Sequence, residues 1–131
     1  MTNEELMGLA KEARNRSYSP YSRFAVGTAL ITKSGKVYLG CNIENAAFSP
    51  TNCAERTAFF SAIADGERDF CAIAICGGKV GESTSACMPC GVCRQVMNEF
   101  CDKDFIILVE DENKKIKEIT LAELLPHSFE L

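Results

Sequence analysis

Three cysteines and one glutamate stand out in this chain because their types and spacing suit a catalytic metal site. Cys53 is followed two residues later by Glu55, and Cys90 and Cys93 belong to a second motif, Pro-Cys-Gly-Val-Cys. Three protein ligands leave the fourth position of a tetrahedral zinc open, which distinguishes a catalytic zinc site from a structural one. Water at such a position ionises near neutral pH, and a neighbouring carboxylate can carry its protons. These residues predict a zinc centre that activates water.

The cysteines have two other interpretations. Cys90 and Cys93 alone could form a redox pair, but that leaves Cys53 and the carboxylate beside it without a purpose. Cys87 could join Cys53, Cys90 and Cys93 in a closed, four-cysteine structural site. We favour three ligands because Cys87 precedes Pro89, outside the helix that would present Cys90 and Cys93 on one face.

Arg56 follows the glutamate and has a chemical reason to lie near the metal. Zinc with three thiolates carries a formal charge of about −1, which weakens it as a Lewis acid. A cation bonded to the sulfurs would offset that charge. The alternative is an ordinary surface arginine.

Hydrophobic periodicity predicts the elements that position these residues. We expect helices over residues 3–16, 53–64, 90–100 and 121–125, and strands over 24–32, 37–41, 70–76, 105–109 and 116–119. A hairpin followed by crossover connections predicts an α/β fold with a mixed sheet and helices on its faces. Cys53 and Cys90 then begin helices, where partial positive charge stabilises thiolates. The remaining cysteines, at 41, 71, 76 and 101, are expected to be buried.

Length and charge restrict the domain count and the partners. The 131 residues suit one domain, 1–131, and the formal net charge is −4. With no basic stripe, the chain is not expected to bind a nucleic-acid polymer. No apolar run reaches the ~20 residues needed to span a membrane. An acidic, polar N-terminus and eight cysteines without an export signal predict a cytoplasmic protein with reduced thiols.

A longer set of segments resembles the cytidine deaminase family of free-nucleoside enzymes. The matching segments are residues 20–27, 40–46, 53–58, 89–95 and 124–129. Cys-Ala-Glu and Pro-Cys-x-x-Cys are shared by several zinc deaminases. The Asn-x-Glu segment and the C-terminal Leu-Leu-Pro-x-x-Phe are more selective for the small nucleoside enzymes. Residues 78–88 look longer than usual and include Cys87, and Pro50 is unusual before Cys53.

The resemblance implies a three-layer α/β fold with a five-stranded mixed sheet, and a homotetramer with shared active sites. It implies one Zn²⁺ per chain and a pocket for free cytosine nucleosides. The roles it implies are metal ligation by Cys53, Cys90 and Cys93, proton transfer by Glu55, ribose binding by Asn42 and Glu44, and contacts to the substrate from Phe24, Ala54 and, across a subunit interface, Phe129.

The expected reaction is zinc-dependent hydrolysis of cytidine and 2′-deoxycytidine to uridine and 2′-deoxyuridine with release of ammonia, as in pyrimidine salvage. One alternative is a deaminase of another cytosine nucleoside such as blasticidin S, which the ribose-binding pair Asn42 and Glu44 disfavours. The other alternative, from a different class, is a non-catalytic zinc module in which Cys87 is the fourth ligand.

Overall fold

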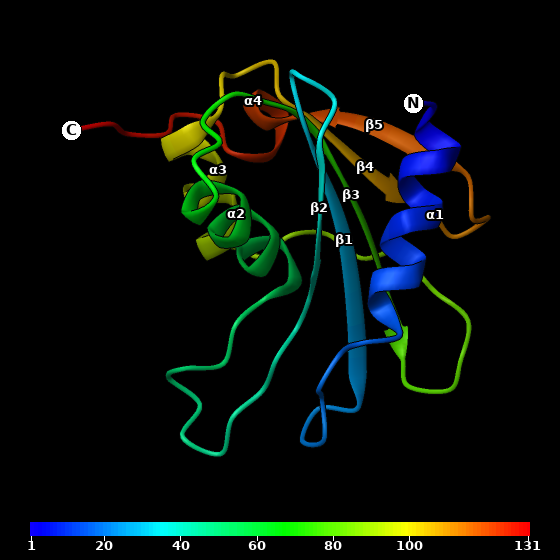
Figure 1. Ribbon diagram of the computed structural model, residues 1–131. Helices are drawn as coiled ribbons and strands as arrows, with labels where there is room; N and C mark the ends of the chain where they lie inside the picture. The colour runs from blue at the N-terminus through cyan, green and yellow to red at the C-terminus, as the bar shows by residue number, and fades with distance from the viewer.

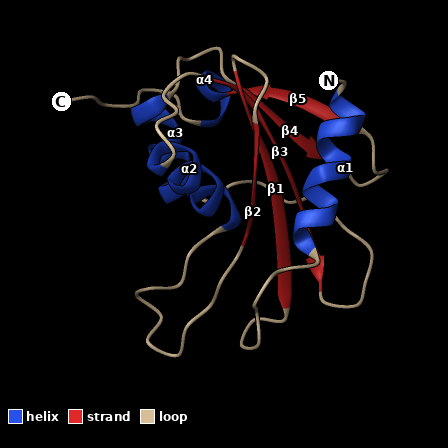
Figure 2. Cartoon of the chain, viewed as in Figure 1, coloured by secondary structure: helices blue, strands red, loops and turns tan.

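A five-stranded sheet divides the molecule into two sides, and helices cover both (Figures 1 and 2). The computed structural model describes residues 1–131. Helix α1 (Asn3–Arg14) packs on one face, and α2 (Ala54–Ala64), α3 (Gly91–Phe100) and the short α4 (Leu121–Leu124) lie on the other. The expected three-layer α/β architecture is confirmed. None of these helices is long and apolar enough to cross a membrane.

The sheet is mixed, with strand order β2-β1-β3-β4-β5. Its strands are β1 (Phe24–Thr32), β2 (Val37–Cys41), β3 (Phe70–Lys79), β4 (Ile106–Glu110) and β5 (Ile116–Thr120). Only β3 and β4 pair in parallel, because α3 lies in the crossover between them; the other pairs are antiparallel.

Strand β3 is longer than its sequence predicts. A loop is expected from residue 77, yet β3 continues to Lys79, and Gly77 and Gly78 pair with Val26 and Ala25 of β1. Glycine weakens a strand on average but admits close neighbours. A Cβ built on Gly77 would lie 2.8 Å from the Cys87 sulfur, so here the glycine makes room for a chain segment that crosses the strand.

Each face of the sheet has its own apolar core. On the α2 side, the Phe59 ring packs edge-on against Phe70 at 5.1 Å between centroids. On the other side, α1 buries Met7 and Ala10. The helix approaches β1 so closely that a Cβ on Gly27 would lie 2.1 Å from the Ala10 carbonyl oxygen, which requires glycine there.

The expectation that four cysteines are buried holds only in part. Cys76 is buried and Cys41 and Cys101 are half-buried, but Cys71 is exposed, so that prediction is wrong for Cys71. The second residue of β3 lies at the rim of the sheet, beside a surface cavity lined by Lys33 and the turn after α3.

Candidate metal centre and active site

The beginnings of α2 and α3 bring three sulfurs together. Cys53 is the N-cap of α2, Cys90 is the N-cap of α3, and Cys93 lies one turn further along α3. Their Sγ atoms lie within 4.8 Å of one another, and those of Cys53 and Cys90 are 3.8 Å apart. Tetrahedral zinc with Zn–S bonds of about 2.3 Å places two sulfurs about 3.8 Å apart. The spacing therefore fits zinc.

The donors also suit zinc chemically. Thiolate ligands favour zinc over magnesium or calcium. The Cys93 thiol lies in hydrogen-bonding contact with Cys53 and, together with Arg56, holds the pKa of Cys53 below its usual range. The same contact, with burial, raises the pKa of Cys93. The Cys93 amide donates to Cys90 Sγ at 3.5 Å, so the start of α3 also stabilises charge on sulfur.

Arg56 lies against this cluster rather than on the surface. Its Nη2 donates to Cys53 Sγ at 3.2 Å, and the Cys53 contact raises the pKa of the guanidinium. Its Nε is buried and has no hydrogen-bond partner. A permanent positive charge is thus directed at the sulfurs that would hold the metal, where it offsets their excess negative charge.

Glu55 is buried beside the sulfurs, with 5% of its surface exposed. Burial raises the pKa of its carboxyl to about 7, and negative charge on Cys53 acts in the same direction. A carboxyl with a pKa near the working pH can both accept and return a proton. Its position and environment suit a general acid–base.

One cavity of about 240 Å³ joins the sulfurs to two polar side chains. Cys53, Glu55 and Cys90 line it, and so do Asn42 and Glu44. Its remaining lining residues are Val26, Thr51, Asn52, Ala54, Cys87 and Met88. Phe24 does not line the cavity; its ring lies beside Gly77, as does the Cys87 sulfur.

The Asn42 amide is held in one orientation by neighbours that the sequence did not reveal. Its Oδ1 accepts from the Val26 amide at 2.9 Å and from the Ser17 hydroxyl, and its Nδ2 donates to the Phe24 carbonyl at 2.8 Å. One Nδ2 hydrogen is left. Asn42 can therefore offer a substrate a single, fixed donor.

The Glu44 carboxylate is held in place by hydrogen bonds and can accept a further one. Its Oε1 accepts from the backbone amides of Tyr21 and Ser22 at 2.9 and 3.1 Å, and its Oε2 accepts from the Ser22 hydroxyl. The Ser22 contact keeps the pKa of Glu44 below its usual range. An ionised carboxylate has room for a further donor. Ser22 lies inside the matching segment 20–27, which was the available signal for it.

Phe129 lies apart from the cavity in its own chain. Its side chain is 66% exposed, and Asn98 Nδ2 donates to its carbonyl at 3.1 Å. The C-terminal tail, red in Figure 1, extends away from the sheet on the α3 side. The structure thus brings together every site residue expected from the sequence except Phe24, whose ring lies beside Gly77, and Phe129.

Comparison with known proteins decides the family. Residues 1–109 match the model of the cytidine and deoxycytidylate deaminase zinc-binding region. The chain belongs to this family. Its curated relatives include a cytidine deaminase of Sporosarcina psychrophila, 47% identical over 98% of this chain and 92% of the relative. Another, of Halalkalibacterium halodurans, is also 47% identical, with 98% and 95% covered.

Solved cytidine deaminases share the fold. The structure from Burkholderia pseudomallei is 45% identical, with a TM-score of 0.88 over 98% of this chain and 100% of that one. The Mycobacterium tuberculosis structure is 35% identical, with a TM-score of 0.84 over 100% of both chains. A blasticidin-S deaminase of Bacillus cereus is 30% identical over 95% of this chain and 90% of its own length.

The geometry of the deaminase site predicts that Cys87 is not a ligand, because the sulfur cluster comprises Cys53, Cys90 and Cys93 without it. Burial raises the pKa of Cys87 to about 12, so its thiol does not readily ionise. Cys87→Ala should keep one zinc per chain after dialysis against a weak chelator, measured by plasma mass spectrometry. Cys93→Ala is the matched control and should lose zinc. Zinc loss from Cys87→Ala would instead indicate a closed four-cysteine site.

Arg56 generates a prediction about pH. Without its charge the sulfurs place more negative charge on the metal, so the activated water ionises at a higher pH. Arg56→Ala should lower turnover about tenfold and move the rise of the pH–rate profile to higher pH. Arg56→Lys, which keeps a positive charge, should move the profile less. An Arg56→Ala profile that overlays that of the unchanged enzyme would contradict this role.

Proposed function

We infer that this chain is a zinc-dependent hydrolase that converts cytidine and 2′-deoxycytidine to uridine and 2′-deoxyuridine, releasing ammonia. One observation carries the conclusion. A buried carboxyl, Glu55, lies beside three converging sulfurs in a cavity that also presents Asn42 and Glu44. Hydrolytic deamination needs an activated water and a proton carrier at the ring, and a nucleoside needs polar groups at its sugar.

Each side chain near the metal has a separate task. Zinc held by Cys53, Cys90 and Cys93 supplies the Lewis acid that makes water nucleophilic near neutral pH. Glu55 accepts a proton from that water and passes it to ring N3. The hydroxide oxygen then bonds to C4, and Glu55 moves the remaining hydroxyl proton to the amine as the C4–N bond breaks. One molecule of water is consumed and one of ammonia is formed. The pKa of Glu55, about 7, suits both directions of transfer.

The sugar is proposed to bind beside Asn42 and Glu44 in the same cavity. The free Nδ2 hydrogen of Asn42 donates to a ribose hydroxyl, and the Glu44 carboxylate accepts from one. Ala54 is the first residue of α2, so its amide has no intrahelical partner and can face the substrate. Phe24, whose ring lies beside Gly77, is proposed to contact the base when the cavity is filled.

The charge of the chain favours small substrates. With a net charge of −4 it has no electrostatic basis for binding phosphate backbones, so we propose free nucleosides rather than polynucleotides. The two rival functions are less well supported. The blasticidin-S relative is 30% identical, whereas cytidine deaminases reach 47%. A four-cysteine module would need Cys87 in the sulfur cluster.

We also propose a single domain over residues 1–131, a homotetramer with shared sites, and a cytoplasmic location. One continuous sheet supports the first proposal. Exposed aromatics, including Phe48 and Phe129 at 75% and 66%, support an assembly that would cover them. Eight unpaired thiols support a reducing compartment.

Glu55→Gln tests the mechanism. The amide keeps the size of the side chain but cannot exchange protons, so turnover of cytidine should fall by on the order of 10⁴-fold, followed by the absorbance change on conversion to uridine. Zinc content should stay at one per chain. Glu12→Gln makes the same change at an exposed position of α1, on the other face of the sheet, and is the control for the loss of one carboxylate. Near-normal turnover by Glu55→Gln would remove this residue from the mechanism.

Phe129 tests the assembly. Light scattering should give the mass of a tetramer, and Phe129→Ala should raise KM about tenfold through lost stacking on the base. Mixing Phe129→Ala with Glu55→Gln chains under subunit exchange should restore sites of normal KM, because each chain supplies what the other lacks.

The matched control for this mixture puts both substitutions in one chain and mixes that chain with Phe129→Ala. No site in the control combines Glu55 with Phe129, so normal KM should not return. A fully active monomer would contradict the shared-site proposal.

A further inference from the structure

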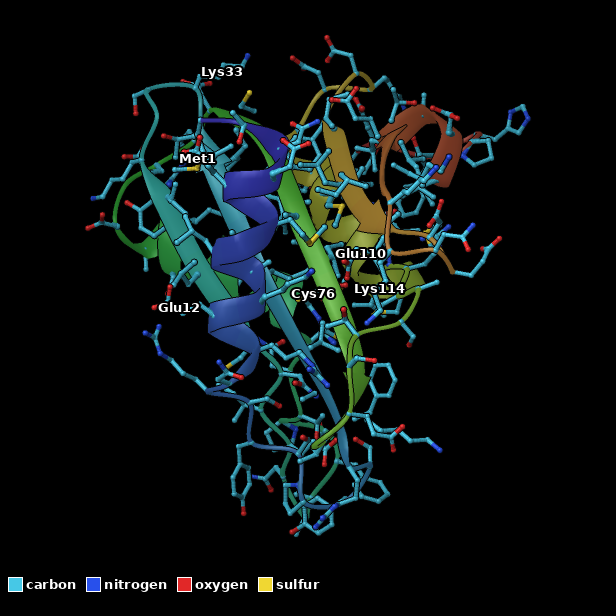
Figure 3. All side chains as sticks on the ribbon, turned by 90° about the vertical axis from the view of Figure 1, so that its right-hand side faces the viewer. Met1, Glu12, Lys33, Cys76, Glu110 and Lys114 are labelled. Carbon is cyan, nitrogen blue, oxygen red and sulfur yellow. The ribbon has the colours of Figure 1, made fainter.

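A buried carboxylate on the face opposite the metal has no part in the chemistry above. Glu110 ends β4 on the α1 side of the sheet, where Figure 3 shows it near Cys76, and it is 3% exposed. Lys11 Nζ lies 2.9 Å from its Oε2, and the Thr84 hydroxyl donates to its Oε1 at 2.7 Å. Burial alone would raise the pKa of Glu110, but these two contacts lower it.

Thr84 belongs to the segment 80–90, here called the crossing loop. In Figure 1 it leaves β3 as a light green loop on the α1 side and then passes to the start of α3 on the opposite side. Hydrogen bonds hold the first part of the crossing loop on the α1 side of the sheet. Arg14 donates to the Glu82 carbonyl at 3.1 Å as well as to Gly78 and Lys79, and the Ser85 amide donates to Gly77 at 2.7 Å.

The second part of the crossing loop builds the substrate cavity. Cys87 and Met88 line the cavity, and Cys90 is one of the three clustered sulfurs. Cys87 is the third residue after Thr84, and an extended chain of three steps spans only about 10 Å. Where Thr84 is held therefore restricts where Cys87 can lie.

The Cys87 sulfur already lies against β3 with little room to spare. A Cβ on Gly77 would come within 2.8 Å of it. Because the sulfur has the strand behind it and the cavity in front of it, a displacement of the loop would move the Cys87 side chain relative to bound nucleoside.

We propose that Glu110 is a positioning residue for the substrate cavity. By accepting the Thr84 hydroxyl on the α1 face, it holds the crossing loop so that Cys87 and Met88 form the cavity wall on the other face. The inference rests on the proposed function, since it takes the occupant of the cavity to be a cytosine nucleoside. Glu110, Thr84 and Lys11 do not line the cavity themselves, so their effect reaches the substrate through the loop.

Thr84→Val is the main test, because valine keeps the shape of threonine and removes the hydroxyl. KM for cytidine should rise on the order of five- to tenfold, since substrate must then order the loop, while kcat changes less than twofold. Zinc content should stay at one per chain. Hydrogen exchange should become faster in the backbone of residues 85–88. Thr84→Ser, which keeps the hydroxyl, should restore KM.

Lys11→Met separates positioning from general stability. It removes the other partner of Glu110 but leaves the Thr84 contact, so KM should stay normal even if the unfolding temperature falls. The double variant Lys11→Met/Glu110→Leu leaves no buried charge unpaired yet deprives Thr84 of its acceptor. This double variant should show the same rise in KM, and it replaces Thr84→Val as the test if Thr84→Val does not fold.

Two results would overturn the proposal: an unchanged KM in the variants that disconnect Thr84, or an equal rise in KM for Lys11→Met. Failure of the proposed function is a separate outcome. A zinc-loaded, unmutated protein that does not deaminate cytidine would show it, and the exchange rates of residues 85–88 would still decide whether Glu110 holds the loop.

Discussion

The convergence of two helix N-termini on one point is the constraint on which the site depends. Thiolates repel one another, and three of them within hydrogen-bonding distance need positive charge around them. Cys53 and Cys90 each cap a helix, and Arg56 donates to Cys53. The sheet makes this possible, because both helices pack on the same face. The metal centre is thus a property of the α2–α3 layer rather than of any single motif.

The two faces of the sheet have different roles. The α2–α3 face holds the three clustered sulfurs, and the α1 face holds the first part of the crossing loop. Arg14 binds carbonyls of β1, β3 and the crossing loop, which brings three separate stretches of backbone under one guanidinium. A side chain far from the metal can therefore influence the substrate cavity by holding the backbone that forms its wall.

Much of the fold follows from periodicity and turn residues. Strands β1 and β2 begin and end where the pattern predicts, since both are apolar runs separated by a Gly-containing turn. The extension of β3 through Gly77 and Gly78 could not be predicted, because glycine pairs indicate loops unless the neighbouring strand is known. The exposure of Cys71 likewise depends on which helix covers the rim of the sheet, which a local pattern does not contain.

The ligands, the carboxylate and the cationic neighbour could be proposed from residue type and spacing alone. The pair proposed to bind the sugar, Asn42 and Glu44, needed the family resemblance, because an Asn and a Glu in a turn are ordinary. The contacts that orient this pair could not be foreseen. Ser17 meets Asn42 only after a hairpin has folded, and Ser22 meets Glu44 across two loops. Hydrogen bonds between short side chains far apart in the sequence produce no periodic pattern from which they could be predicted.

Under the proposed function, the fixed amide of Asn42 determines which sugars the cavity accepts. Three neighbours hold the Asn42 side chain before any ligand binds. The conformational entropy of this side chain is therefore lost during folding and not during binding. Its remaining hydrogen and the fixed Glu44 carboxylate then form a rigid template. A ligand without the matching hydroxyl would leave desolvated polar groups without hydrogen-bond partners. That costs more binding free energy than the loss of a contact alone. On this proposal, the fold sets the selectivity for the sugar before substrate binds, because a sugar that lacks these hydroxyls leaves polar groups unpaired.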